Sequence, residues 1–415
     1  MMQCRRSFVC VLLVVLVSTI GLADDWPQWR GSNRDGLSSE TGLLKSWPKS
    51  GPLLVWKATG LGAGFSSISI SGQRIFTMGD KDDKAYAHAV NLADGKNLWS
   101  TEIGRAGAPG WGNFEGTRST PTVDGNLVFV LGQYGELACL KIDDGSKVWE
   151  KHLEKVFDGK RPEWGYSESV LVDRDKVLCT PGGKDGAIIA LDKKTGNLVW
   201  QTKDFTDGAH YSSLVCAEIG GVKQYIQLTA ESVVGVDTKG QMLWRADRKG
   251  KTAVIPTPIV SGNKVYVTSG YGIGSNLFEI EQIDGKFKAT QVYANKSIAN
   301  QHGGAILVRD YVYSYCDREK GWVCQELATG DLKWAEKGSV GKGALTYADG
   351  YLYLRSEDNK KVALIEATPD RYEETGLFTQ PDSGRPKTWP HPVVAGKKLY
   401  LRDQDILLCY DVEAG

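Results

Sequence analysis

The stretch "ALDKKTGNLVW", residues 190–200, combines a β-rich run, a tight turn and a second β-rich run that ends on tryptophan. An Asp or Thr side chain can hydrogen-bond the turn backbone, and Gly196 supplies the positive φ that a hairpin turn requires. Trp200 has a large apolar surface to bury, so it is suited to join one unit to the next. The stretch therefore predicts a hairpin whose second strand packs against a neighbouring unit.

The same phrase recurs along the chain. Successive copies end at Trp99, Trp149, Trp200 and Trp244, which are 50, 51 and 44 residues apart. Each copy follows β-rich runs bounded by Gly, Asn and Asp, and a repeat of about 45 residues matches one four-stranded propeller blade. Worn copies end at Tyr293 and Phe378. The tryptophans expected to dock one blade on the next are Trp56, Trp99, Trp149, Trp200, Trp244 and Trp334.

The two ends of the chain complement each other. The C-terminal "CYDVEAG", residues 409–415, is the phrase cut off at its glycine, and "PLLVW", residues 52–56, supplies a final strand with its tryptophan. We expect an all-β, eight-bladed propeller of four-stranded antiparallel blades, in which the N-terminal strand completes the last blade and removes an open sheet edge. Seven blades is the alternative, if one worn copy is only a long loop.

Three segments divide the chain. Residues 1–23 combine Arg5 and Arg6 with an apolar run and a small-residue end, "GLA", which is typical of a cleavable export signal. An uncleaved anchor is the alternative, although the run is short for a span of about 20 residues. Residues 24–51 are expected to form an N-terminal arm and residues 52–415 the propeller. The protein is then periplasmic or secreted, with no transmembrane segment after signal removal.

Charge and cysteines exclude several classes of function. Lys+Arg and Asp+Glu both total 50, which gives no indication of nucleic acid or an anionic membrane surface as a partner. No CxxC motif is present, so the sequence excludes a zinc ribbon and a redox-active CxxC pair. Cys139, Cys324 and Cys409 replace the small residue of the phrase and are expected to be buried and free. Cys316 and Cys324 flank a turn, and a disulfide between them is an open alternative.

The repeat A-x-D-x-x-T-G-x-x-x-W resembles that of the pyrroloquinoline quinone (PQQ) dehydrogenases and their non-enzymatic relatives, which include the propeller lipoprotein of the outer-membrane barrel-assembly machinery. The resemblance covers nearly all of residues 52–415. "DDWPQWRGSNRDG" (24–36), "TPGGKDGAIIALD" (180–192) and "HPVVAGKKLYLRDQDILLCYDV" (391–412) resemble an exported bacterial subgroup called PQQ-like.

The resemblance implies two functions. PQQ alcohol dehydrogenases carry a vicinal Cys-Cys pair beside the cofactor and a calcium ion, and this chain has no Cys-Cys pair. Sugar-oxidising PQQ enzymes lack that pair, so PQQ with calcium stays open as a cofactor. One fold hosts many functions. The leading prediction is a non-catalytic binding or scaffold module that meets an envelope protein or small ligand through one face; the alternative is a PQQ-dependent dehydrogenase acting on an alcohol or sugar.

A candidate ligand site lies at the channel mouth. The first strand of each blade lines the channel, so the residues leading into these strands ring one mouth. Three of the five histidines, His210, His302 and His391, fall at this position. Either polar groups simply line the channel, or they converge on a ligand. The other mouth candidates are Phe65, Arg118, Tyr166, Thr257 and Lys342, with Tyr211 and Trp111 beside them.

A three-histidine metal site is not expected at this mouth. Zinc requires each ligand at about 2.0–2.1 Å, and histidines from alternate blades of a wide ring stand too far apart. A bound anion or quinone reached by Arg118, Lys342 and the imidazoles suits a wider mouth better. No catalytic residue is assigned from the sequence.

Overall fold

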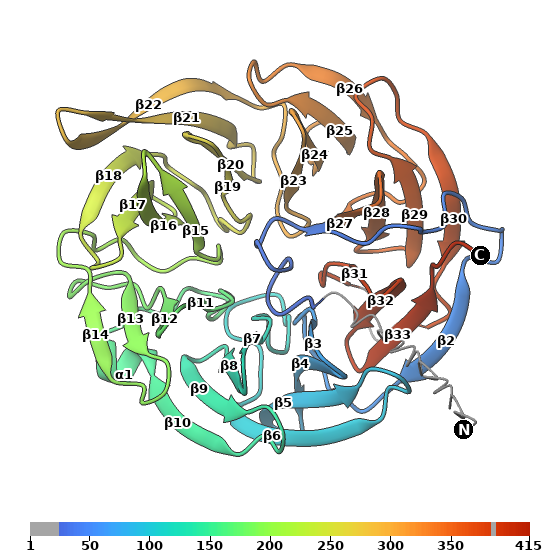
Figure 1. Ribbon diagram of the computed structural model, residues 1–415, viewed down its shortest axis with the longest axis horizontal. Helices are drawn as coiled ribbons and strands as arrows, with labels where there is room; N and C mark the ends of the chain where they lie inside the picture. The colour runs from blue at the N-terminus through green and yellow to red at the C-terminus, as the bar shows by residue number, and fades with distance from the viewer. Residues whose placement is uncertain (1–24, 383–386) are drawn as a thin grey trace, which may run out of the picture.

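Eight antiparallel sheets surround a central axis in the computed structural model, which describes residues 25–382 and 387–415 (Figure 1). Each blade contributes four strands, and successive strands run from the axis to the rim. The predicted eight-bladed propeller is confirmed, and the seven-blade alternative is removed. The predicted signal, residues 1–23, lies outside the described residues.

The first four blades follow the repeat in register. Their strands are β3 (Ser69–Ser71), β4 (Arg74–Lys81), β5 (Lys84–Asn91), β6 (Asn97–Arg105); β7 (Thr122–Asp124), β8 (Leu127–Leu131), β9 (Glu136–Lys141), β10 (Lys147–His152); β11 (Leu171–Asp173), β12 (Lys176–Cys179), β13 (Ile189–Asp192), β14 (Leu198–Gln201); and β15 (Val215–Ile219), β16 (Val222–Leu228), β17 (Ser232–Asp237), β18 (Met242–Asp247). A short helix, α1 (Leu153–Phe157), follows β10.

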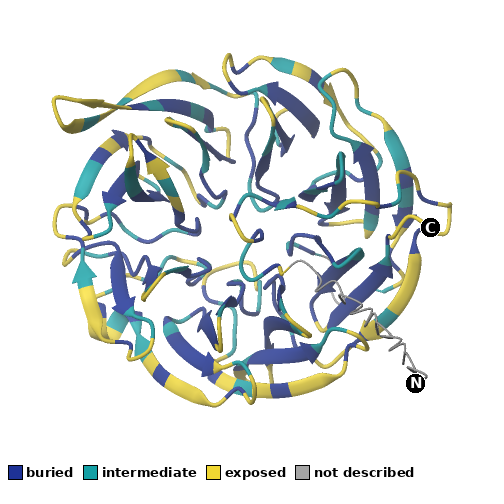
Figure 2. Cartoon of the chain, in the orientation of Figure 1, coloured by how far each residue is buried: buried dark blue, intermediate teal, exposed yellow. Residues whose placement is uncertain are grey.

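The remaining blades complete the ring. Their strands are β19 (Ile259–Ser261), β20 (Lys264–Ser269), β21 (Gly274–Ile283), β22 (Lys286–Asn295); β23 (Ala305–Val308), β24 (Tyr311–Cys316), β25 (Gly321–Glu326), β26 (Leu332–Glu336); β27 (Gly343–Ala348), β28 (Tyr351–Ser356), β29 (Lys361–Glu366), β30 (Glu374–Thr379); and β31 (Val393–Ala395), β32 (Lys398–Asp403), β33 (Ile406–Asp411), β2 (Leu53–Ala58). Buried residues fill the inner strands, and exposed residues follow the outer ones (Figure 2).

Four of the docking tryptophans, Trp56, Trp99, Trp149 and Trp200, each lie over a turn glycine of the next blade. A Cβ added to Gly145 or Gly196 would stand 2.6 or 2.7 Å from the ring of Trp99 or Trp149, closer than any real contact. The indole also donates a hydrogen bond into that blade, from Trp149 Nε1 to the Lys193 oxygen at 2.9 Å. Equivalent indole bonds join Trp99 to Ile142, Trp200 to Thr238 and Trp334 to Thr368. The aromatic residue and the glycine of the repeat therefore form one inter-blade contact.

The fifth copy of the repeat, which ends at Tyr293, departs from the pattern for a structural reason. Strands β21 and β22 are 10 residues each, so their turn lies beyond the position that a docking ring reaches. A Cβ on the turn residue Gly285 would meet nothing within 4 Å, and Trp244 bonds Gln224 of its own blade instead. The expected role of Trp244 in docking is therefore only partly met, since its hydrogen bond stays within the fourth blade. Tyr293 takes up the standard role and donates to the Leu327 oxygen at 2.9 Å.

The N-terminal strand closes the ring as predicted. Strand β2 pairs antiparallel with β33, and Trp56 stands opposite Cys409. The expectation that Gly415 is the turn glycine of this blade is wrong. A Cβ on Gly415 would meet nothing, whereas one on Gly51 would lie 2.6 Å from the Phe378 ring. Gly51, two residues before β2, therefore lies under the Phe378 ring in place of Gly415.

The six cysteines among the described residues are free. Cys139, Cys324 and Cys409 are buried, as their place in the phrase predicts. The alternative of a Cys316–Cys324 disulfide is excluded by the register of the hairpin, because Cys316 stands opposite Gly321 while Cys324 stands opposite Tyr313.

The N-terminal arm crosses the centre of the ring before it reaches β27 (Figure 1). Trp26 bridges to Ile70 of the first blade, Arg30 donates to the Ala305 oxygen of the sixth, and Arg34 donates to the Ser169 oxygen beside the third. Strand β1 (Leu37–Ser38) then adds in parallel to β27. Both arginines are 4% or less exposed, so the arm is a plug that contacts blades all around the ring.

Among the described residues, no helical segment has the length and apolarity that a membrane crossing requires.

The ring-over-glycine contact can be tested with a matched pair of substitutions. Gly196→Ala places a methyl group against the Trp149 ring at a φ of +69°, whereas Gly72→Ala has a φ of +56° and open space. Both variants bear the left-handed strain, about 1–2 kcal/mol, and only Gly196→Ala adds overpacking of about 1–3 kcal/mol. Urea denaturation should therefore show a clearly larger loss for Gly196→Ala, and equal losses would contradict the contact.

Candidate functional site

A cavity of about 280 Å³ opens at one mouth of the ring, and we call it the cup. It is built from the loops that lead into the inner strands, together with the β20–β21 and β28–β29 turns. Its lining residues are Trp29, Phe65, Trp111, Phe114, Arg118, Trp164, Ser167, Ser169, Tyr211, Ser213, Ala253, Ile255, Tyr271, Gln301, His302, Glu357, Lys387 and Trp389.

One wall of the cup is an aromatic row. Trp111 and Trp164 meet edge to face at 5.4 Å, and Trp164 lies 6.0 Å from Tyr211. Trp164 Nε1 donates to the Trp111 oxygen at 3.0 Å, which ties the two loops together. Trp111 is nevertheless 64% exposed. The row therefore presents a fixed apolar surface to solvent at the rim.

A second wall of the cup is a stack of rings around Trp389. His302 lies parallel to Trp389, with 3.9 Å between centroids and 8° between planes, and Phe65 stacks at 4.0 Å. Phe114 adds a tilted contact at 5.0 Å. This wall is filled by the protein's own rings.

The arm supplies the floor. Trp29 donates from Nε1 to Thr257 Oγ1 at 3.0 Å, and its ring lies 4.6 Å from that of His391. His391 in turn contacts the His302 oxygen through Nε2 at 2.9 Å. The cup is therefore closed toward the channel by residues that hold the plug.

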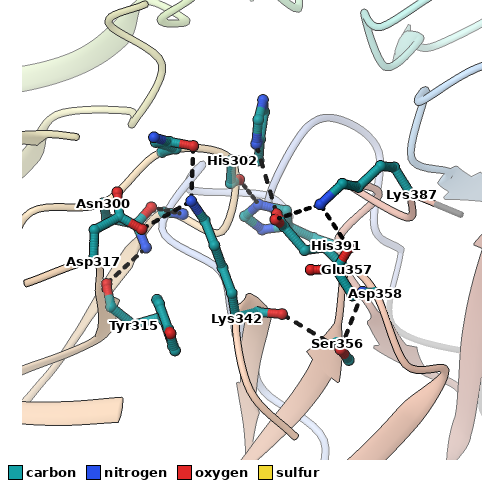
Figure 3. Close-up of polar contacts among 12 residues, drawn as sticks. Asn300, His302, Tyr315, Asp317, Lys342, Ser356, Glu357, Asp358, Lys387 and His391 are labelled. Carbon is teal, nitrogen blue, oxygen red and sulfur yellow. Dashed lines mark hydrogen bonds and ion pairs between the residues drawn. The ribbon is translucent and has the colours of Figure 1, made fainter. Parts of the chain in front are cut away.

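A charged cluster forms around Glu357, close to His302 (Figure 3). Lys387 reaches Asp358 at 2.6 Å and Glu357 at 3.5 Å, and His302 Nδ1 is 3.8 Å from Glu357 Oε2. Burial lowers the pKa of His302, so this imidazole is neutral at pH 7. Burial opposes ionisation of Glu357, but His302, Lys342 and Lys387 outweigh it and hold its pKa below the usual range. Glu357 is therefore a carboxylate facing a neutral imidazole.

Arg118 is bound within the protein. It donates to the Gly116 oxygen at 2.9 Å, the Phe114 oxygen at 2.6 Å and Gln133 Oε1 at 3.2 Å. Burial lowers its pKa to about 10, which leaves it cationic. Its main role is to fix the loop that carries Trp111 at the rim of the cup.

The structure brings some of the predicted mouth residues together and separates others. Arg118, His302, Tyr211, Trp111 and Phe65 line the cup. The others lie outside its lining. Tyr166 is buried and bonds the Pro181 oxygen, His210 accepts from the Val254 amide, Lys342 pairs with Asp317, and Thr257 and His391 hold Trp29.

Several lining residues were not predicted. Trp389 stands two residues before His391 in "TWPHPVV", and Trp164 two before Tyr166 in "WGYSESV", so both were adjacent to candidates. Glu357 and Lys387 lie in the β28–β29 turn and the loop after β30. Trp29 belongs to the arm, for which the sequence offers no periodic signal.

The residues present do not fit PQQ with calcium. Calcium takes six to eight oxygen ligands, and no group of three His, Cys, Asp or Glu side chains in residues 25–382 and 387–415 is placed to hold a metal ion. An acidic quinone needs available cations, but Lys342 is paired with Asp317 at 2.8 Å and Arg118 is bound to carbonyls. The predicted anion site therefore lacks available cations, and we derive no step through this cofactor.

A buried carboxyl lies beneath the cup, next to the plug. Glu168 is 2% exposed and accepts hydrogen bonds from the Thr180 amide at 2.7 Å and from Gln227 at 3.4 Å. Burial raises its pKa to about 7, although these bonds and the Arg34 charge oppose the rise. Its protonation is thus linked to the folded state.

Comparison with known proteins identifies relatives of this architecture. A sequence model described as outer membrane protein assembly factor BamB matches residues 83–336. The BamB of Shewanella oneidensis is 22% identical over 345 residues, 81% of this chain and 68% of that protein. The BamB of Moranella endobia is 22% identical over 197 residues, 46% of this chain and 45% of its own length. The match thus spans less than half of that second relative.

Solved structures share the fold at low identity. The BamB of Moraxella catarrhalis superposes with a TM-score of 0.59 at 13% identity, covering 84% of this chain and 95% of that one. A quinohemoprotein alcohol dehydrogenase from Comamonas testosteroni gives 0.64 at 11%, covering 94% and 81%. At such identities the likeness concerns the fold alone.

The raised pKa of Glu168 predicts a pH-dependent stability. Between about 4.5 and about 7 the folded carboxyl keeps a proton that the unfolded one loses, so its contribution is full below that window and is lost as the pH rises. The free energy of unfolding of the wild type should fall relative to Glu168→Gln by up to about 3 kcal/mol across this window. Urea denaturation at several pH values measures it.

Glu357→Gln is the matched comparison, because its lowered pKa predicts stability that is present above the unfolded pKa and lost on acidification. A Glu168→Gln profile parallel to that of the wild type would show that folding does not raise the pKa of this carboxyl.

Proposed function

The chain belongs to the PQQ-like propeller family described as outer membrane protein assembly factor BamB, and from that premise we propose that it is a non-catalytic binding or scaffold module of the cell envelope. The observation that carries the proposal is the cup face. Its rim exposes Trp111 on a loop fixed by Trp164 and Arg118, while its ionic groups are paired within the protein. Exposed, rigid aromatic side chains are typical of surfaces that recognise a partner.

The geometry favours recognition over chemistry. The arm closes the channel beneath the cup, and the histidines near it, His210 and His391, have pKa values lowered by burial to about 4 and about 3. A general base is most effective with a pKa near the working pH. These imidazoles are too weakly basic for that role and instead bond backbone atoms.

A PQQ-dependent dehydrogenase is the second candidate, because the C. testosteroni enzyme shares the fold. Titration of the purified protein with PQQ and calcium separates the two functions. We expect no saturable change in quinone absorbance up to about 100 μM and no dye reduction with alcohols or sugars. Tight binding followed by dye reduction would replace the scaffold proposal with the enzyme.

The binding face can be located by site-specific photo-crosslinking in cells. A photoreactive phenylalanine at Trp111 should yield a defined adduct with an envelope component, because this side chain stands at the rim. The matched control is Val148, 40% exposed on the outer strand β10, which should yield none. Adducts at Val148 in place of Trp111 would show that the binding surface is the outer edge of the propeller and not the cup.

A further inference from the structure

The chemistry of the cup specifies the kind of ligand that the proposed binding module takes. Its first relevant feature is the aromatic row. Trp111, Trp164 and Tyr211 form a continuous wall, held by the 3.0 Å bond from Trp164 to the Trp111 oxygen. Tyr271, 38% exposed, lines the same cavity. Such surfaces attract ligands that present C–H groups or rings.

The second feature is a buried nitrogen without a hydrogen bond, next to a carboxylate whose contacts are long. His302 Nδ1 is buried without a hydrogen bond in the described structure, and it faces Glu357 Oε2 at 3.8 Å. Glu357 Oε1 is 3.5 Å from Lys387 Nζ. Both separations exceed a normal hydrogen bond. A ligand hydroxyl group could bridge these atoms at normal hydrogen-bond distances. It would donate to the Glu357 carboxylate and accept from His302 Nδ1 or Lys387 Nζ.

The third feature is the charge balance. Lys387 is neutralised by Asp358 at 2.6 Å and by Glu357, and Arg118 faces Asp80 among its carbonyl partners. A cationic ligand would meet Lys387 and Arg118, and an anionic one would meet Glu357. Each cation of the lining already has an acidic neighbour, so the cup favours a ligand without net charge.

We infer that the cup binds a neutral carbohydrate, with one sugar ring against Trp164 and its hydroxyl groups on Glu357, His302 and Lys387. The inference rests on the proposed binding function and names the ligand of that same site. A polyhydroxylated ring presents a C–H face to the aromatic row and hydroxyl groups to the polar cluster. The cavity of about 280 Å³ lies at the small end of ligand pockets, which suits one ring with the rest of a glycan leaving past Trp111.

Trp29 sets the depth of the site. It lines the cavity, and its indole is held by Thr257 at 3.0 Å. The ligand therefore rests on the arm, so the plug that closes the channel also forms part of the binding site.

The test uses the full-length mature protein and defined probes. Glucose, N-acetylglucosamine and their linear trisaccharides are titrated by calorimetry and by tryptophan fluorescence. We expect saturable binding of at least one neutral probe below about 10 mM. Because the ligand is uncharged, the affinity should change little between low salt and about 0.5 M salt.

Matched variants locate the binding. Trp164→Ala should abolish it, and Glu357→Gln, which keeps the shape of the side chain, should weaken it about 10-fold or more. The controls are Val148→Ala and Glu150→Gln on the outer strand β10, which should bind as the wild type does. Circular dichroism and thermal melting confirm that each variant is folded before its affinity is compared.

Inorganic phosphate and choline serve as charged probes. Saturable binding of either one at the cup, with no binding of the neutral sugars, overturns the inference. So does sugar binding that survives both Trp164→Ala and Glu357→Gln. Failure of all sugars with a retained crosslink at Trp111 rejects the carbohydrate and leaves the scaffold function standing, whereas sugar binding without any crosslink at Trp111 counts against the scaffold alone.

Discussion

The contact between an aromatic ring and the turn glycine of the next blade sets the architecture. The glycine is required twice: its backbone is left-handed, and the ring occupies the space of any Cβ, as at Gly196 under Trp149. Because the indole also bonds the adjacent carbonyl, each blade is fixed in distance and in orientation to its neighbour. Where the hairpin lengthens in the fifth blade, the contact is lost, and Trp244 turns to Gln224 of its own blade.

The blades and their closure were predictable because the information is local and repeated. Turn chemistry, strand pattern and the terminal aromatic residue recur in each unit, and the two half-copies at the chain ends show which strand is missing. The arm was not predictable in this way. Arg30 and Arg34 are buried in the channel, yet charged residues in a stretch without periodicity read as a solvated segment. Gly51 was missed because it lies near the N-terminus, whereas the rest of this copy of the phrase lies at residues 409–415.

The candidate site was predictable only in part, because the direction of a side chain depends on its offset from the strand. Arg118 lies four residues before β7 and lines the cup, whereas Tyr166 lies five before β11 and points into the core. The offset alone does not decide the direction, because these loops are irregular: His302 lies three residues before β23 and also lines the cup. Glu357 and Lys387 come from other connections, and only the assembled ring brings them beside His302.

The pairing of β2 with β33 joins residues from opposite ends of the chain. Contacts of such large sequence separation slow folding, since the loop entropy is lost before the contact forms. The last blade cannot be completed until the C-terminal strands have left the ribosome. The arm, by contrast, is synthesised before the blades. Its residues bond Ile70, Ser169 and Ala305, which belong to or adjoin three different blades. The blades can therefore assemble on an arm that is already synthesised. This reduces the conformational search that precedes the pairing of β2 with β33.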